Sequence, residues 1–185
     1  MRFRPLHPLA LLLALTLGLA GCDDAGTGDF PLTPIGAAFT FSFDADDLVD
    51  GAARVDAQGS ENVLDGITAQ GFTAGEVVRA RIEEGSAQVR ILQAPGGVNI
   101  SFLDNVSLRL SGGGTSAEVA SAEDVGGGTS MANEAELDVS GGDVADVVTA
   151  GPVDATLDVS VDPGIPDGTY RLEVRFDVEV FVEGI

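Results

Sequence analysis

The longest regular pattern in this 185-residue chain lies near its carboxy-terminus. In TYRLEVRFDVEVFVE, residues 169–183, apolar side chains from Tyr170 to Val182 occupy every second position, and mostly charged side chains lie between them. Successive side chains of a β-strand point to opposite faces of a sheet, whereas a helix of this sequence would spread its apolar side chains around its whole circumference. The stretch therefore predicts a long strand with one buried face.

The same period of two recurs along much of the chain. In AFTFSFD, the side chains of Phe39, Phe41 and Phe43 alternate with polar ones, which predicts another half-buried strand. Turn sequences rich in glycine and proline, among them EEGS, APGG, SGGGTS and DPGIPDG, separate the candidate strands. Further strands are predicted at 78–82, 87–91, 98–102, 106–110, around Val119, at 137–139 and at 157–161.

These patterns predict about nine short strands and very little helix. The stretches SENVLDGITA and GGDVADVVTAG are bounded by turn residues and are expected to form only a turn or two of helix each. Many strands separated by tight turns, in a chain of this size, favour an all-β fold, namely an antiparallel β-sandwich. A closed barrel is the alternative arrangement.

The amino-terminal segment has the layout of a secretory signal peptide. Arg2 and Arg4 precede an apolar run, residues 9–20, which ends at small residues before Asp23 and Asp24. The run is too short for a transmembrane helix, which needs roughly 20 apolar residues. We therefore expect residues 1–21 to be removed as a signal peptide.

The four residues Leu19-Ala20-Gly21-Cys22 resemble the lipobox of bacterial lipoproteins. The resemblance implies that the thiol of Cys22 receives a diacylglyceryl group and that cleavage occurs just before it, which would anchor the chain in a membrane. The alternative is an ordinary signal peptide with a chance cysteine. A free thiol is a liability in an oxidising compartment, and Cys22 is the single cysteine of the chain, so lipidation explains it better.

The expected domain organisation follows from these two regions. Residues 1–21 form the signal peptide, and residues 22–36 comprise the lipidated cysteine and a flexible tether without periodicity. Residues 37–185 form one β-sandwich domain, which is an ordinary size for a single domain.

The chain is strongly acidic, with 30 aspartates and glutamates against 9 basic residues and a net charge of −21. Loss of Arg2 and Arg4 with the signal peptide would make the net charge −23. Such a surface repels nucleic acids and anionic lipids, so we expect no nucleic-acid partner. Two interpretations of the acidity stay open: general adaptation to salty surroundings, or a cation site built from clustered carboxylates.

The residue types available after cleavage exclude most catalytic chemistry. There is no lysine, the single histidine His7 lies in the signal peptide, and Cys22 is expected to be acylated. Serine and cysteine triads, imidazole and thiolate metal sites and Schiff-base mechanisms are therefore excluded. Paired carboxylates are able to hydrolyse glycosidic bonds, but the chain has no tryptophan and one tyrosine to stack on a sugar. We expect neither enzymatic activity nor an organic cofactor.

Two acidic groups are candidate calcium ligands, since this ion prefers several oxygen donors. The first group follows the strand predicted at residues 39–43 and consists of Asp44, Asp46, Asp47 and Asp50. The second consists of Asp158, Ser160, Asp162 and Asp167. Pro163 stands where a calcium loop of the second kind needs glycine, so the metal prediction is restricted to the first group.

From residue 76 to 182 the order of features also resembles an uncharacterised family of bacterial envelope lipoproteins. The matching motifs are Ala94-Pro95-Gly96, Ser101-Phe102-Leu103, Val119-Ala120-Ser121 and the strand from Thr169 to Val182. The family pattern contains a hairpin before the Pro-Gly turn. The resemblance implies a β-sandwich and no defined activity.

Two function hypotheses follow. The first is a non-enzymatic lipoprotein, anchored in the outer membrane or at the cell surface, whose sandwich is a structural or adhesive module of the envelope. The second is a binding module for a cation such as calcium, a glycan or an envelope protein, acting through loops at one end of the sandwich. A metal near residues 44–50 or an exposed apolar patch would favour the second.

Overall fold

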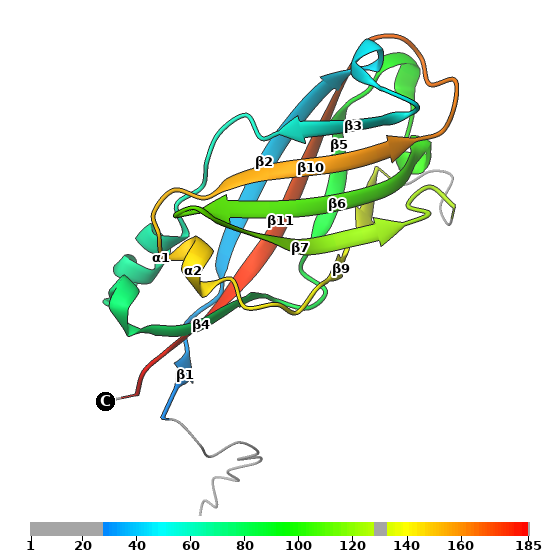
Figure 1. Ribbon diagram of the computed structural model, residues 1–185. Coiled ribbons are helices and arrows are strands. Elements are labelled where there is room, and N and C mark those ends of the chain that lie inside the picture. Colours follow the sequence, from blue (N-terminus) through cyan, green and yellow to red (C-terminus); the bar gives the residue numbers. More distant parts are fainter. Residues whose placement is uncertain (1–27, 128–132, 185) are drawn as a thin grey trace, which may run out of the picture.

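The computed structural model describes residues 28–127 and 133–184 and consists of two antiparallel sheets packed face to face (Figure 1). The predicted all-β sandwich is therefore confirmed. Sheet A contains β1 (Phe30–Pro31), β2 (Ile35–Asp44), β4 (Val77–Ile82), β5 (Gln88–Gln93), β8 (Glu134–Glu136) and β11 (Thr169–Val182). Sheet B contains, in spatial order, β3 (Ala52–Asp56), β10 (Asp154–Val161), β6 (Leu103–Gly112), β7 (Thr115–Glu123) and β9 (Asp138–Val139).

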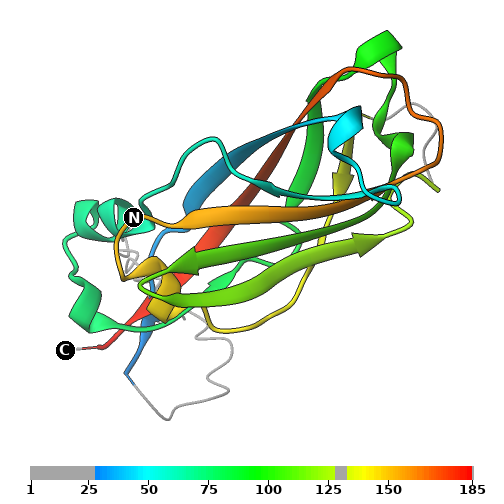
Figure 2. The same ribbon diagram turned by 45° about the horizontal axis from the view of Figure 1, so that its top comes forward.

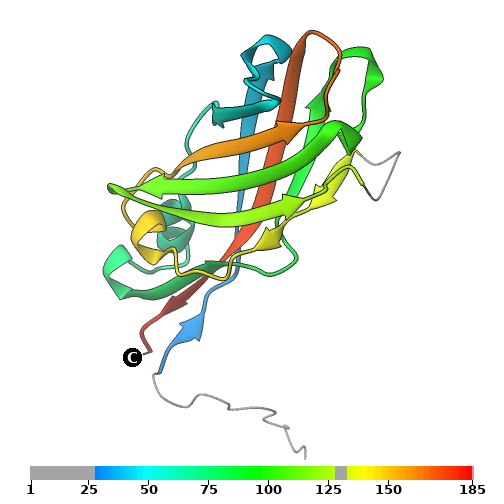
Figure 3. The same cartoon turned by 45° about the vertical axis from the view of Figure 1, so that its right-hand side comes forward.

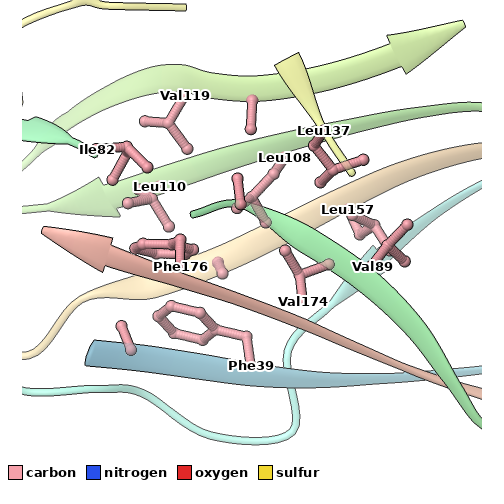
Figure 4. Close-up of a cluster of buried hydrophobic side chains, with 14 of the residues drawn as sticks. Phe39, Ile82, Val89, Leu108, Leu110, Val119, Leu137, Leu157, Val174 and Phe176 are labelled. Atoms are coloured by element: carbon pink, nitrogen blue, oxygen red, sulfur yellow. The ribbon is translucent and has the colours of Figure 1, made fainter. Parts of the chain in front are cut away.

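Strand β11 is the long strand predicted from the alternation, and it forms the centre of sheet A. One edge pairs with β2 and the other with β5 and β4. The apolar side chains of β11 at even positions from 170 to 182 are all buried. Phe176 stacks on Phe39 of β2 with ring centroids 6.0 Å apart. Figure 4 shows both rings in the apolar layer between the sheets, together with Leu108, Leu157 and Val174.

The turn predicted at EEGS lies between strands β4 and β5, but these strands do not form the hairpin that the family resemblance implies. Ile82 pairs with Val178 and Gln88 pairs with Arg175, so both strands run in the same direction along one edge of β11. Residues 83–87 bulge out between them, and the Ser86 hydroxyl accepts a hydrogen bond of 3.0 Å from the backbone N–H of Asp177. A strand as long as β11 offers enough edge for both segments, which local sequence does not reveal.

The segment predicted as a strand at residues 98–102 is also different in the structure. It forms two short 3-10 turns, η3 (Pro95–Gly97) and η4 (Ile100–Phe102). Gly96 and Gly97 have positive φ angles of 66° and 71°, and the Asn99 side chain accepts a hydrogen bond from Ser101 N. Ile100 and Phe102 are buried, as the apolar pattern predicts. The backbone of this segment, however, is not extended.

The short helices close one end of the sandwich. Helix α1 (Val63–Ala69) and helix α2 (Ala145–Val148) lie within the two stretches expected to form a helical turn or two. They bury Ile67 and Val148 against the core. The remaining 3-10 turns are η1 (Ala45–Asp47) and η2 (Ala74–Glu76). We call the end with β1, α1, α2 and the last residues of β11 the proximal end, and the end with loops 45–51, 94–102 and 162–168 the distal end (Figures 1 and 2).

The boundary between tether and domain differs from the predicted one. Phe30 and Pro31 pair with Val182 and Phe181, so the sheet already begins in β1 (Figure 3). Leu32 is buried and donates a hydrogen bond of 2.8 Å to the carbonyl of Val180. The chain steps away from β11 between β1 and β2, where the Gln70 amide bonds both the N–H and the carbonyl of Thr33. This interruption removes the period of two, which is why the segment resembled a tether.

Candidate functional site

The predicted lipidation site lies outside the described residues. Cys22 and the lipobox motif Leu19-Ala20-Gly21-Cys22 precede residue 28, where the described part of the chain starts. Within residues 28–127 and 133–184, no helix has the length and apolar character that crossing a membrane requires. The lipid anchor therefore stays a prediction.

The first acidic group lies at the distal end, where β2 leads into η1. The Asp47 carboxylate accepts a hydrogen bond of 2.9 Å from the backbone N–H of Asp44. The Asp44 carboxylate in turn accepts from the Thr169 hydroxyl at the start of β11. Asp46 is exposed in η1, and Asp50 occupies a turn position with a φ of 53°. Two of the four predicted ligands thus have local roles, capping η1 and joining β2 to β11.

The second acidic group is divided between a strand and a loop. Asp158 and Ser160 belong to β10, whereas Asp162 and Asp167 lie in the loop that follows it. That loop and Asp50 line a hollow of about 360 Å³ at the distal end. Among the residues that the structure describes, however, no three acidic, histidine or cysteine side chains are grouped so that they would hold a metal ion. The geometry lends no support to calcium at Asp44, Asp46, Asp47 and Asp50, and that site stays a prediction.

A larger hollow lies elsewhere, on the outer face of sheet B. It is an open groove of about 810 Å³ across β3, β10, β6 and β7, which form the front layer in Figure 1. Its volume falls within the range of about 300–1,000 Å³ usual for small-molecule sites. We call it the sheet B groove, and it is lined by Asp47, Val49, Ala52, Ala53, Arg54, Asn105, Val106, Ser107, Glu118, Ser121, Ala122, Glu123, Asp158, Val159 and Ser160.

The floor of the groove is a row of side chains that crosses four strands. Arg54 pairs in register with Asp158, Asp158 with Ser107, and Ser107 with Ser121. The outward positions of β6 and β7 in this row carry serine, and the small side chains leave a hollow beside the longer Arg54. Neither the Ser107 nor the Ser121 hydroxyl has a hydrogen-bond partner within the described part of the chain. Both hydroxyls are therefore free to donate to and accept from a ligand.

The Arg54 and Asp158 side chains form one fixed wall of the groove. Arg54 Nε and Nη2 lie 2.7 and 3.0 Å from the two carboxylate oxygens of Asp158. These hydrogen bonds, and the charge of Asp158, raise the pKa of Arg54. The two parallel bonds orient both planar groups, as paired arginine and carboxylate groups commonly do. At 69% exposure, the Arg54 side chain still presents most of its surface to solvent.

The rest of the groove is polar and predominantly acidic. Ser160 accepts hydrogen bonds from the backbone and side-chain nitrogens of Asn105, at 3.0 and 2.9 Å. Glu118 is 3.7 Å from Arg109 Nη2, a distance too long for a hydrogen bond, and Glu123 is exposed. Four carboxylates, from Asp47, Glu118, Glu123 and Asp158, thus face a single lining arginine. The groove therefore favours ligands that carry hydrogen-bond donors or positive charge.

The outer face of sheet A is different, because its charged side chains contact one another. Arg81 Nε lies 2.7 Å from Glu179, and Arg175 bonds the Gln88 amide oxygen at 2.6 Å. Arg79 lies over the Phe181 ring, 4.3 Å from its centroid. Arg90 Nε lies 2.8 Å from Glu173 Oε1, although it is not aligned for a hydrogen bond. Apart from Arg90 Nε, these groups are paired with one another, so the sheet B groove is the better candidate for a ligand site.

Sequence reasoning did not find the groove. Strand β3 was not predicted, because AARVD contains a single buried apolar side chain, Val55, and shows no clear alternation. Ser107 was recognised only as an outward position of a predicted strand, Ser121 as part of the motif Val119-Ala120-Ser121, and Ser160 as a member of the second acidic group. Their small size on three neighbouring strands was a usable signal, but only the strand order places them together.

Comparisons with known proteins add little. No protein-family model matches the chain, and no curated protein matches it. Among solved structures, a chain of the desmodium yellow mottle tymovirus covers 83% of this chain and 91% of its own length, with 10% sequence identity and a TM-score of 0.30. A likeness this weak carries no inference about fold or function.

Proposed function

We propose that this protein is a lipid-anchored, non-enzymatic component of a bacterial cell envelope whose β-sandwich is a structural or adhesive module. The observation that carries the proposal is the motif Leu19-Ala20-Gly21-Cys22 directly behind an apolar run and a basic amino-terminus. The lipid on Cys22 is the contact with the membrane. Stable anchoring follows if several acyl chains are attached, since each buried methylene contributes about 0.8 kcal/mol.

The position of β1 supports an arrangement close to the membrane. Because β1 starts at Phe30, only residues 23–29 separate it from Cys22. Fully extended, seven residues span no more than about 25 Å. The proximal end would therefore face the membrane, and the distal loops would point away from it. This orientation keeps Asp46, Asp47 and Asp50 apart from anionic lipid headgroups.

The side chains of the described domain support a non-enzymatic role. It has no lysine, histidine or cysteine, and the groove offers only carboxylates, hydroxyls, one amide and one guanidinium. We place the protein at the outer membrane or the cell surface, where a strongly acidic domain stays hydrated and meets external partners. Nucleic acid is not among the partners that we propose.

A binding role is the second candidate function, and the sheet B groove is the observation that favours it. The groove opens on a sheet face, not among the end loops where a binding site was anticipated from sequence. Adhesion and ligand binding are compatible, since an adhesive module needs a recognition surface.

The anchor is tested by replacing the single cysteine. Cys22→Ser should accumulate as an unprocessed or lipid-free protein that no longer incorporates labelled fatty acid or partitions into detergent. Thr27→Ser, outside the motif, is the matched control and should behave like the parent. Protease treatment of intact cells should remove the domain if it lies at the surface. Normal lipid labelling and membrane retention of Cys22→Ser would refute the proposal.

A further inference from the structure

We propose that the sheet B groove binds an oligosaccharide that carries free amino groups, and that its floor is formed by Ser107 and Ser121. The inference rests on the proposed function only for its biological setting, because it gives an adhesive envelope module its ligand. The binding itself depends on the groove and not on the anchor.

The hydroxyl groups on the floor of the groove match those of a sugar. Ser107 and Ser121 face each other across β6 and β7 and are half-buried, and both hydroxyls lack a partner within residues 28–127 and 133–184. A hydroxyl both donates and accepts, and so does each hydroxyl of a sugar. A polyhydroxylated ligand therefore both donates hydrogen bonds to these two hydroxyls and accepts hydrogen bonds from them. A ligand that carries donors alone makes only the first kind of bond.

The charge of the groove favours a ligand with amino groups. Asp158 is compensated by Arg54 at 2.7 Å and Glu118 lies 3.7 Å from Arg109 Nη2, but Asp47 and Glu123 leave the groove with excess negative charge. An ionised carboxylate only accepts hydrogen bonds, so the ligand must supply donors. Phosphorylated, sulfated and uronic acid sugars are repelled by the carboxylates. An ammonium group on the sugar adds attraction and a charge-assisted hydrogen bond.

The shape of the groove favours an extended ligand. The groove crosses four strands, which lie about 4.8 Å apart in a sheet, and it is open along its length. An open channel of that extent suits several linked sugar units better than a single enclosed one. No aromatic ring lines it, so recognition depends on hydrogen bonds and charge, with Val49, which is 74% exposed, as an apolar contact at the rim.

The experiment measures binding of defined probes to the purified full chain in detergent by titration calorimetry. The probes are glucosamine oligomers, N-acetylglucosamine oligomers of the same length, and spermidine. We expect the glucosamine oligomers to bind at least tenfold more tightly than either other probe, and added salt to weaken that binding. No measurable binding of glucosamine oligomers, or spermidine binding that is equally tight, would overturn the inference.

Variants test the location of the site. Ser107→Leu fills the floor from the solvent side and should lower the affinity at least tenfold. Thr40→Leu on the outer face of sheet A is the matched control and should leave it unchanged. Glu118→Gln with Glu123→Gln should remove the preference for the free amine while the chain stays folded by circular dichroism. Unaltered affinity in folded Ser107→Leu would overturn the assignment. Cys22→Ser should bind normally, so failure of the anchor and failure of the groove are separate results.

Discussion

The hydroxyl of Tyr170 donates a hydrogen bond of 2.8 Å to the carbonyl oxygen of Pro166, four residues earlier in the chain. Tyr170 is completely buried, and its ring lies 5.3 Å from that of Phe43 and 4.9 Å from that of Phe102. The bond fixes the distal loop 162–168 to the start of β11. This small network joins the loop, sheet A and turn η4.

Tyr170→Phe tests the bond separately from the packing. The change removes one hydrogen bond and keeps the aromatic ring, so we expect the free energy of unfolding to fall by about 1 kcal/mol. Tyr170→Leu should cost more, because it also loses the contacts with Phe43 and Phe102. Denaturant unfolding of the parent and both variants measures the difference. An unchanged free energy of unfolding in Tyr170→Phe would show that the hydroxyl contributes nothing.

The same residue predicts a dependence of stability on alkaline pH. Burial, and secondarily the charge of Asp167, raises the pKa of Tyr170 above its ordinary value of 10.0. The folded state then holds the phenolic proton more tightly than the unfolded state. The contribution of Tyr170 to stability is complete below pH 10.0 and is lost as the pH rises through the folded-state pKa.

This pH dependence is directly measurable, because Tyr170 is the single tyrosine and there is no tryptophan. Tyrosinate absorbance should appear at higher pH in the folded protein than in the chemically unfolded one. The stability of Tyr170→Phe should lack this alkaline decline. A phenol that titrates identically in both states would contradict the prediction.

Phe176 and Asp177 test the two faces of β11. Phe176 is 3% exposed and stacks on Phe39, so Phe176→Ala should lower the free energy of unfolding by about 3–5 kcal/mol. The Asp177 side chain points outward, and Asp177→Ala should cost far less. Thermal and denaturant unfolding give both values. Similar small losses at the two positions would mean that the strand is not packed on one face.

The bulge between β4 and β5 depends on Ser86, whose hydroxyl accepts from Asp177 N–H and donates 2.7 Å to the Glu83 carbonyl. We expect Ser86→Ala to destabilise the protein by about 1 kcal/mol and to speed hydrogen exchange at the Asp177 amide. Ser42→Ala, on the outer face of β2, serves as the control. Unchanged exchange in Ser86→Ala would show that the bulge is held by other contacts.

The acidity is tested by salt and calcium. If it reflects general surface adaptation, monovalent salt should raise the melting temperature gradually, and calcium should add little at constant ionic strength. A true site at Asp44, Asp46, Asp47 and Asp50 would instead give a saturable shift, since a ligand at a hundred times its dissociation constant stabilises by about 2.7 kcal/mol. We expect the gradual response. A saturable shift that Asp46→Asn abolishes would establish the calcium site.

Much of the secondary structure was readable from the sequence, because a period of two is a local property of neighbouring side chains. The alternation in residues 169–183 identified both the strand β11 and its buried face, and the triplet Phe39, Phe41 and Phe43 did the same for β2. The alternation gave a wrong prediction where local backbone geometry determines the secondary structure. At residues 98–102 the glycines before them and the Asn99 side chain impose turns on a sequence that alternates like a strand.

The tertiary structure alone decided which strands are neighbours, because pairing depends on contacts between residues far apart in the chain. It placed β4 and β5 on one edge of β11, so that the turn between them does not reverse the chain. In the folded protein AARVD is an edge strand of sheet B, and Phe30 pairs with β11 in sheet A. The sheet B groove has the same origin, since Arg54, Ser107 and Asp158 come from three strands that become adjacent only when the sheet forms. Outward polar positions look alike in sequence, and strand order determines which of them share a surface.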